Sequence, residues 1–75
     1  MDIYIEGFDN AEAENVYEEL LGLGLDVGIE VDRAYGKDES VVIYDFSDID
    51  DTYTRNYVQQ ILDELEDEGY IVTKV

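Results

Sequence analysis

The sequence predicts one α+β domain whose elements follow the order strand, helix, strand, strand, helix, strand. Two longer segments repeat apolar residues at the spacing of an amphipathic helix. Four short segments are rich in β-branched and aromatic residues or alternate apolar with polar side chains, as strands do. The chain has 75 residues, which suffices for a single modest core, so residues 1–75 are expected to form one domain.

The first strand and the first helix are expected near the N-terminus. Residues 2–6 alternate apolar and polar side chains, and Gly7 is expected to end this strand. Asp9 is the expected N-cap of a helix that extends to about Leu21, with Glu12 at the spacing of a capping box. The buried stripe of this helix is expected to contain Ala13, Val16, Tyr17, Leu20 and Leu21. The glycines that follow, Gly22 and Gly24, are typical of a helix end.

A β-hairpin is expected next along the chain. Its strands cover residues 26–35 and 41–46, and the polar segment 36–40, which contains Gly36, forms the turn. One side of its first strand carries Val27, Ile29, Val31 and Arg33.

The second strand of this hairpin sets which side chains face the core. Tyr44 and Phe46 fall on the same side of the strand and are expected to be core residues. Val41 and Ile43 would then face outward, which favours a covered sheet face or a dimer. Tyr4, on the first strand, is a candidate for the open face of the sheet.

A second, longer helix and a last strand complete the chain. Ser47 and Asp50 repeat the capping pattern, and the helix is expected from about Asp50 to Glu68. Its apolar face is expected to comprise Thr54, Val58, Ile61, Leu62 and Leu65, flanked by Tyr53 and Tyr57. Gly69 follows as the residue after the helix cap, and residues 70–75 form the last strand.

This element order is the ferredoxin-like βαββαβ pattern. It predicts a four-stranded antiparallel sheet of order 4-1-3-2 with both helices on one face. The name concerns topology only, because a chain without Cys cannot hold an iron–sulfur cluster through thiolates. A different α+β arrangement of the same elements is the alternative.

The composition is dominated by acid. Asp and Glu number 21 against four basic residues, and His is absent, so the net charge is −17 at pH 7. The basic residues are Arg33, Lys37, Arg55 and Lys74. Such a charge destabilises the compact state through self-repulsion. Hydrophobic residues nevertheless make up 45% of the chain and fall in ordered runs, so a folded acidic domain is expected rather than a disordered tail.

The residues do not point to catalysis or to a cofactor. The absence of His and Cys removes common bases, nucleophiles and metal ligands. Ser40 and Ser47 have no visible activating partner in the sequence. An EF-hand loop counted from Asp48 needs Gly and Glu where Tyr53 and Gln59 stand, so the neighbouring acids are interpreted as helix-capping residues. We expect neither an enzyme nor a cofactor or metal, with a casual divalent-cation site near Asp48 as the open alternative.

Nucleic acids and membranes are disfavoured as direct ligands. Four cations against 21 acids cannot supply the phosphate contacts on which nucleic-acid binding depends. No apolar run approaches the length of a membrane span, and anionic membrane surfaces would repel the chain. The N-terminal residues lack the basic and apolar regions of a signal peptide, so a cytoplasmic protein is expected.

Some of the acid stands where helix stability would not place it. Glu66, Asp67 and Glu68 end the second helix, where the helix dipole favours cations. The pairs Glu14–Glu18, Asp63–Asp67 and Glu64–Glu68 put like charges four residues apart, and each pair destabilises an isolated helix. Selection for a function of the acidic surface explains this placement.

In size, acidity, absence of Cys and dense apolar content, the chain resembles phage-encoded DNA-mimic proteins, which include anti-restriction, anti-CRISPR and uracil-glycosylase inhibitor proteins. The resemblance covers the whole chain and rests on composition and compactness, not on a sequence motif, and these families do not share one fold. It implies a stoichiometric inhibitor of a nucleic-acid-binding protein or complex, acting in the cytoplasm of the host cell.

The outward faces of the two helices are the predicted contact surface. Acids three or four residues apart lie about 5–6 Å from each other along a helix, a spacing similar to that of phosphates on a nucleic-acid strand. The predicted contact residues are Glu14, Glu18, Glu19, Asp48, Asp50, Asp51, Tyr53, Tyr57, Asp63, Glu66, Asp67 and Glu68.

Other surfaces and other functions compete with this prediction. A rival acidic patch on the sheet face comprises Asp2, Glu6, Glu30, Asp32 and Asp45. The alternative functions are an acidic protein–protein interaction module or dimeric regulator, and a salt-adapted domain whose acidic surface is passive.

Overall fold

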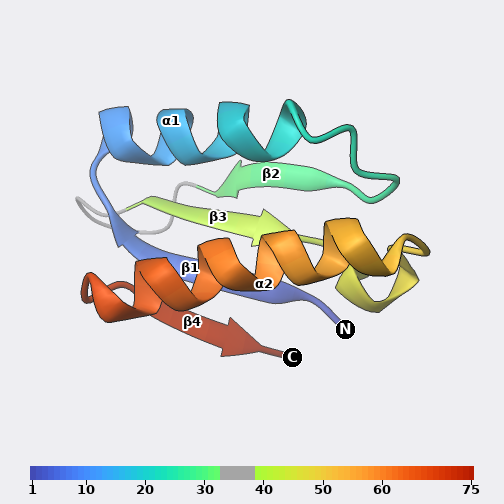
Figure 1. Cartoon of the computed structure of the whole chain (residues 1–75). Helices are drawn as coiled ribbons and strands as arrows, with labels where there is room; N and C mark the ends of the chain where they lie inside the picture. The colour runs from blue at the N-terminus through green and yellow to red at the C-terminus, as the bar shows by residue number, and fades with distance from the viewer. Residues whose placement is uncertain (33–38) are drawn as a thin grey trace.

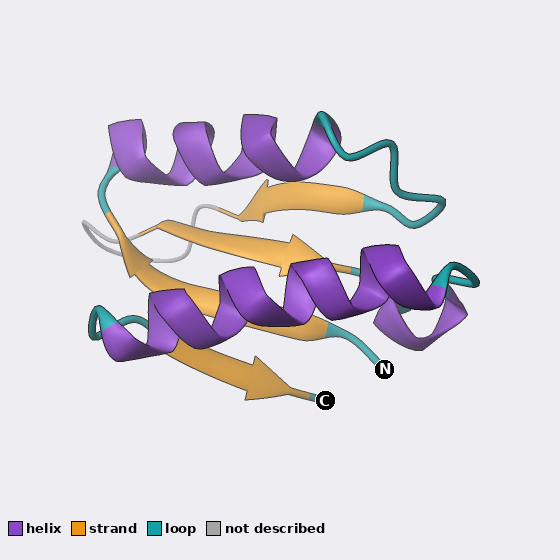
Figure 2. Cartoon of the chain, viewed as in Figure 1, coloured by secondary structure: helices purple, strands orange, loops and turns teal. Residues whose placement is uncertain are grey.

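The computed structural model describes residues 1–32 and 39–75 and has the predicted element order (Figure 1). The elements are β1 (Ile3–Phe8), α1 (Asn10–Leu21), β2 (Ile29–Asp32), β3 (Glu39–Ile43), the short 3-10 helix η1 (Phe46–Asp48), α2 (Thr52–Asp67) and β4 (Ile71–Lys74). All strand pairs are antiparallel and the sheet order is β2-β3-β1-β4, which is the predicted 4-1-3-2 order read from the other end. Both helices cover the same face of the sheet (Figure 2), so the ferredoxin-like arrangement is confirmed.

Strand β1 continues past Gly7, where it was expected to end. Gly7 has a φ of 101°, and the pairing with β3 shifts register between Glu6 and Phe8. This irregularity is a β-bulge, and glycine adopts its left-handed backbone without the clash that a Cβ would cause. The bulge turns the fully buried Phe8 ring into the core.

Helix α1 begins where its cap predicts. The Glu12 backbone N–H donates to Oδ1 of Asp9 at 2.9 Å, which confirms Asp9 as the N-cap. Ala13 and Leu20 are buried as expected, but Leu21 is 49% exposed. The prediction for Leu21 is wrong because one further residue rotates by about 100° around the helix, which carries that side chain off the buried stripe.

Helix α2 begins at Thr52, two residues later than expected, and its N-cap is Asp51, whereas Ser47, the expected capping residue, lies in η1. Oδ1 of Asp51 accepts from the Tyr53 backbone N–H at 3.1 Å, and Oδ2 accepts from the Thr54 hydroxyl at 2.6 Å. The predicted apolar face is confirmed, since its central side chains Val58, Leu62 and Leu65 are all buried. Gly69 follows the helix with a φ of 105°, as a residue after a helix cap does.

Strand β2 begins at Ile29, later than expected, whereas β3 already includes Glu39 and Ser40, which were expected in the turn, and ends at Ile43, earlier than expected. The orientation predicted for the second strand is wrong. Val41 and Ile43 are fully buried, and they pair across the sheet with Ile5 and Ile3, which belong to the same core. The pattern failed because β3 ends at Ile43 and the strand alternation does not continue to residue 46. Arg33 and the turn residues 36–38 lie outside the described part of the chain.

Beyond β3 the chain turns through Asp45, whose φ of 53° is left-handed. This turn separates two aromatic residues that were expected to share one side. Phe46 is buried in the core, as predicted, but it reaches the core from η1. Tyr44 is only half-buried and lies on the open face of the sheet, where its hydroxyl donates to Glu30 at 3.1 Å.

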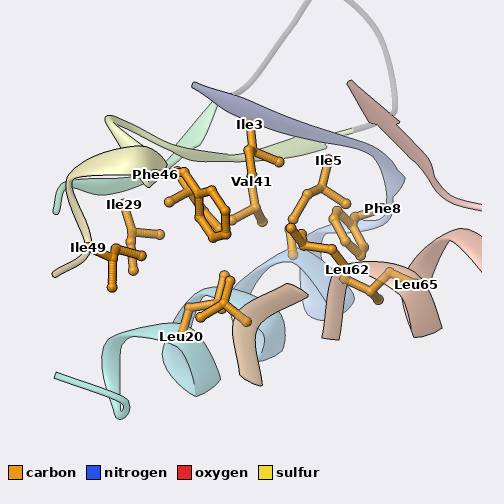
Figure 3. Packing of buried hydrophobic residues seen from close by; sticks show 13 residues of the cluster. Ile3, Ile5, Phe8, Leu20, Ile29, Val41, Phe46, Ile49, Leu62 and Leu65 are labelled. Carbon is orange, nitrogen blue, oxygen red and sulfur yellow. The ribbon is translucent and has the colours of Figure 1, made fainter. Parts of the chain in front are cut away.

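The core lies between the sheet and the two helices (Figure 3). Its members are Ile3, Ile5, Phe8, Ala13, Leu20, Ile29, Val41, Ile43, Phe46, Ile49, Val58, Leu62 and Leu65. Burial of these side chains drives the assembly of the layers, because transfer of apolar surface from water stabilises a fold by about 25 cal/mol per Å². Among the described residues, neither helix combines the length and apolarity that crossing a membrane requires.

Candidate protein-binding surface

Every side chain of the predicted contact surface is exposed on the folded domain. Tyr53 is 79% exposed and Tyr57 is 43% exposed. These side chains are therefore accessible to a partner. Glu14 and Glu18 of α1 lie on a different side of the domain from Asp63 of α2.

The acids of α1 face the edge strand β2. Glu14 and Glu18 line a groove of about 410 Å³ together with Tyr17 of α1 and with Ile29, Glu30 and Val31 of β2. Glu19 lies about 100° further around the helix than Glu18, so it is directed away from this groove. The predicted trio of α1 is thus divided between two sides of its helix.

Asp63 of α2 lies toward the opposite edge of the sheet, beside β4. Oδ1 of Asp63 accepts from Nε2 of Gln59 at 3.0 Å, and Oε1 of Gln59 accepts from Nζ of Lys74 at 3.2 Å. This chain of hydrogen bonds places the Asp63 flank of α2 over β4. Because β2 and β4 are the two edges of the sheet, Glu14 and Glu18 of α1 border one edge and Asp63 of α2 borders the other.

The acids that precede α2 have different roles in the structure. Asp48 and Asp50 are exposed, whereas Asp51 is committed to the helix cap. The hydrogen bond from the Thr54 hydroxyl, followed by that from the Tyr53 backbone N–H, holds the pKa of Asp51 below its ordinary value of 3.8. Asp51 is therefore ionised at neutral pH, and its two oxygens are already accepting hydrogen bonds.

Two tyrosines form an aromatic ridge on the side of α2 that approaches the end of α1. Tyr53 and Tyr57 line a hollow of about 150 Å³ with Leu23 and Thr54. The same rings border a second hollow of about 230 Å³ with residues of the outer face of α2, Asn56 and Gln60. Exposed aromatic rings offer a partner a large rigid contact area.

The two described cations do not neutralise these acids. Nη1 of Arg55 donates to the backbone carbonyl oxygen of Ile49 at 3.3 Å, and Lys74 donates to the side-chain oxygen of Gln59. Both acceptors are uncharged. Among the described residues, these hydrogen bonds of Arg55 and Lys74 therefore leave the helix acids unneutralised.

The open face of the sheet carries the rival acidic patch around an aromatic centre. Tyr4 is half-buried there, and its strand partners are Val42 and Thr73. Glu6, Glu30 and Asp32 are exposed, while the Asp2 carboxylate accepts from the backbone N–H of Asp45 at 3.0 Å. The predicted patch is therefore an exposed surface, in which acids surround aromatic and apolar side chains.

Tyr44 joins this patch although it was expected in the core. The hydrogen bond to Glu30, with partial desolvation, raises the pKa of the Tyr44 hydroxyl above its ordinary value of 10.0. The turn residue Asp45 directly after Tyr44 is the sequence signal that marks the end of the strand alternation, because Asp tolerates the left-handed region.

Tyr70 forms a second hydrogen-bonded tyrosine site that sequence reasoning missed. Its hydroxyl donates to Oε2 of Glu12 at 2.7 Å, and its ring packs on Phe8 with centroids 4.4 Å apart. The hydrogen bond to Glu12, followed by desolvation and the charges of Glu12, Glu68 and Asp9, raises the pKa of Tyr70 to about 12. A strand pattern alone cannot reveal a contact between residues so far apart.

Within residues 1–32 and 39–75, no group of three or more His, Cys, Asp or Glu side chains is arranged to hold a metal ion. No protein-family model, curated protein or solved structure matches this chain.

Proposed function

We propose that this protein is a DNA mimic that inhibits a host-defence protein, such as a CRISPR or restriction nuclease complex, by occupying its basic nucleic-acid-binding groove. The observation that carries the proposal is the exposed acid of both helices, which the described cations leave uncompensated. Inhibition is steric and electrostatic, without chemistry.

The spacing of the acids supports this proposal. Asp63–Asp67 within α2, and Glu64 with the C-cap residue Glu68, are pairs four residues apart, a spacing that puts the Cβ atoms of a pair about 5–6 Å from each other. A row of Lys and Arg side chains that contacts successive phosphates can contact such a series of carboxylates. The like charges cost helix stability, and binding to a basic partner relieves their repulsion.

The shape of the domain supports the same function. Its extents are 35 × 23 × 23 Å, and the two shorter ones are on the scale of the width of a nucleic-acid duplex. A groove that surrounds a duplex has room for the whole domain. In such a groove the acids at both edges of the sheet contact basic walls, which a single acidic strip could not do.

The aromatic ridge of Tyr53 and Tyr57 complements the negative charge of the helix acids. Long-range attraction between opposite charges accelerates association, but salt screens it over about 8 Å at physiological ionic strength. Contacts of Tyr53 and Tyr57 with the partner depend little on salt. They are expected to slow dissociation, as buried aromatic residues do at protein interfaces.

Competition with duplex DNA tests the proposal. The protein is immobilised and incubated with a bacterial lysate, and retained proteins are eluted either with excess duplex DNA or with salt. A mimic retains a nucleic-acid-binding complex that DNA displaces, and the purified complex loses its nuclease activity when the protein is added. A retained partner that DNA leaves in place contradicts mimicry.

A charge-reversal variant locates the contact surface. Asp63→Lys, Glu66→Lys and Asp67→Lys together should abolish inhibition while circular dichroism shows an intact fold. The matched control applies the same charge change to the sheet face through Glu6→Lys, Glu30→Lys and Asp32→Lys. Inhibition that survives in the helix variant and disappears in the control assigns the contact to the sheet face.

A further inference from the structure

We propose that the open edge of β2 and the groove beside it bind an extended, basic segment of a partner protein, which adds to the sheet as a further strand. This inference does not depend on nucleic-acid mimicry. It rests on the exposed edge of the sheet, on the groove between β2 and α1, and on the charge of the residues that border both.

Strand β2 is an edge strand, because it pairs only with β3 in the order β2-β3-β1-β4. The backbone N–H of Tyr44 donates to the carbonyl oxygen of Gly28 at 2.9 Å, which fixes the alternation along β2. By that alternation Glu30 directs its backbone groups toward β3, whereas Ile29 and Val31 direct their N–H and C=O groups to the open edge. These are the groups that an added strand pairs with.

The groove gives the added strand a wall on its helix side. Ile29 is buried and Val31 half-buried, and both side chains lie on the same face of the sheet as α1. Tyr17 of α1 provides an aromatic surface beside them in the groove of about 410 Å³. An extended segment can therefore place alternate side chains in this groove while its backbone pairs with β2.

Charge complementarity selects the occupant. Glu14 and Glu18 border the groove on the helix side, and Glu30 and Asp32 project from the opposite face of β2. Side chains on both faces of an added strand thus meet carboxylates, which favours Lys or Arg on both faces. A second copy of this chain would bring its own acids against these, so the same charges disfavour edge-to-edge pairing of two copies.

The other edge of the sheet differs in charge. The reciprocal backbone hydrogen bonds between Asp2 and Val75 fix the alternation of β4, so Val72 and Lys74 direct their backbone groups outward. Lys74 is a cation on that strand and repels a basic segment. Val72 resembles Val31 in being a half-buried valine on an edge strand, and it supplies a matched control.

The experiment uses a short blocked peptide in which two Lys residues alternate with two Thr residues, so that both faces of the extended peptide carry cations; it is titrated into the isotope-labelled protein. Amide hydrogen exchange is followed by NMR. Pairing at the β2 edge should slow exchange of the backbone N–H groups of Ile29 and Val31, which otherwise point to the open edge of the sheet. Val31→Pro removes one outward donor and should weaken peptide binding at least about tenfold, since a lost pairing of this kind is of that order.

Two controls separate strand addition from general attraction to an acidic surface. Val72→Pro places the same substitution on the β4 edge and should leave the affinity unchanged. Should Val31→Pro fail to fold, Glu14→Gln with Glu18→Gln is compared with Asp63→Asn and Asp67→Asn, and only the first pair should weaken binding. The proposal is overturned if saturating peptide leaves amide exchange at Ile29 and Val31 unchanged, or if both pairs of charge substitutions weaken peptide binding equally. Neither outcome bears on DNA mimicry.

Discussion

The hydroxyl of Tyr70 donates a hydrogen bond of 2.7 Å to the carboxylate of Glu12, across 58 positions of sequence. The contact ties the first turn of α1 to the segment between α2 and β4. It also assigns Glu12 a tertiary role beyond the capping spacing that its sequence position suggested. Because the bond requires a protonated phenol, it makes part of the stability of the fold dependent on pH.

Tyr70→Phe should reduce stability below pH 10 and lose its effect at higher pH. The raised pKa means that the fold favours the protonated hydroxyl. Its contribution is complete below the ordinary pKa of 10.0 and is lost as the pH rises through about 12. Thermal melts of both proteins between pH 8 and 12 measure the difference in melting temperature. A difference that does not shrink with pH contradicts the assigned hydrogen bond.

Asp51→Ala should lower the melting temperature at neutral pH by removing the cap of α2. The lowered pKa of Asp51 means that its contribution is present above 3.8 and is lost as the pH falls below that value. Asp51→Asn, which keeps an oxygen acceptor, serves as the control and should retain most of the stability. The idea fails if the effect of Asp51→Ala is as large at pH 2 as at pH 7.

Gly7→Ala should destabilise the fold by about 1–2 kcal/mol, the cost of a left-handed backbone at a residue that carries a Cβ. Space is not the cause, since the added Cβ meets Cδ1 of Tyr70 at an ordinary 3.7 Å. Gly28→Ala is the matched control, because its Cβ would meet Cδ2 of Tyr44 at 3.6 Å without the positive φ. Urea unfolding of the two variants tests this, and equal losses would point away from backbone strain.

Ile43→Val should cost about 0.5–1.5 kcal/mol and Ile43→Ala about 2–5 kcal/mol, because the side chain is fully buried. Leu21→Ala should be nearly neutral, since Leu21 is 49% exposed. Denaturant unfolding gives these free energies. Small losses of stability for the Ile43 variants, together with a large loss for Leu21→Ala, would support the burial that the sequence suggested and contradict the structure.

Asp67→Lys should stabilise α2 by about 0.3–1 kcal/mol, because it places a cation at the negative end of the helix dipole. The wild-type protein should melt cooperatively at low ionic strength, and added salt should raise its melting temperature by screening self-repulsion. The gain from Asp67→Lys should shrink in salt. A chain that folds only at high salt would instead fit a salt-adapted domain with a passive surface.

Local patterns predicted much of the fold. Asp9 and Gly69 mark helix ends through backbone chemistry that operates within one turn, so their roles could be read from sequence. The stripe of Val58, Leu62 and Leu65 follows from helical periodicity in the same way. Each of these features depends only on residues that are near each other along the chain.

The orientation of β3 could not be predicted in that way. Its pattern of Val41, Ile43, Tyr44 and Phe46 is apolar on both sides, so periodicity allows either face to be the core. The left-handed turn at Asp45 and the pairing of Ile43 with Ile3 decide the matter. The sequence likewise shows how many acidic residues the chain has, but not that they divide between the two edges of the sheet.

By itself, the sequence determined the element order, the N-cap of α1 at Asp9 and the excess of acid, because each depends on local spacing or on composition. Tertiary structure decided which side of β3 is buried, that Glu14 and Asp63 border opposite edges, and that β2 keeps an open edge beside an acidic groove. These relations depend on which strands become neighbours. That choice is made by the packing of one shared core, where residues distant in sequence compete for the same buried space.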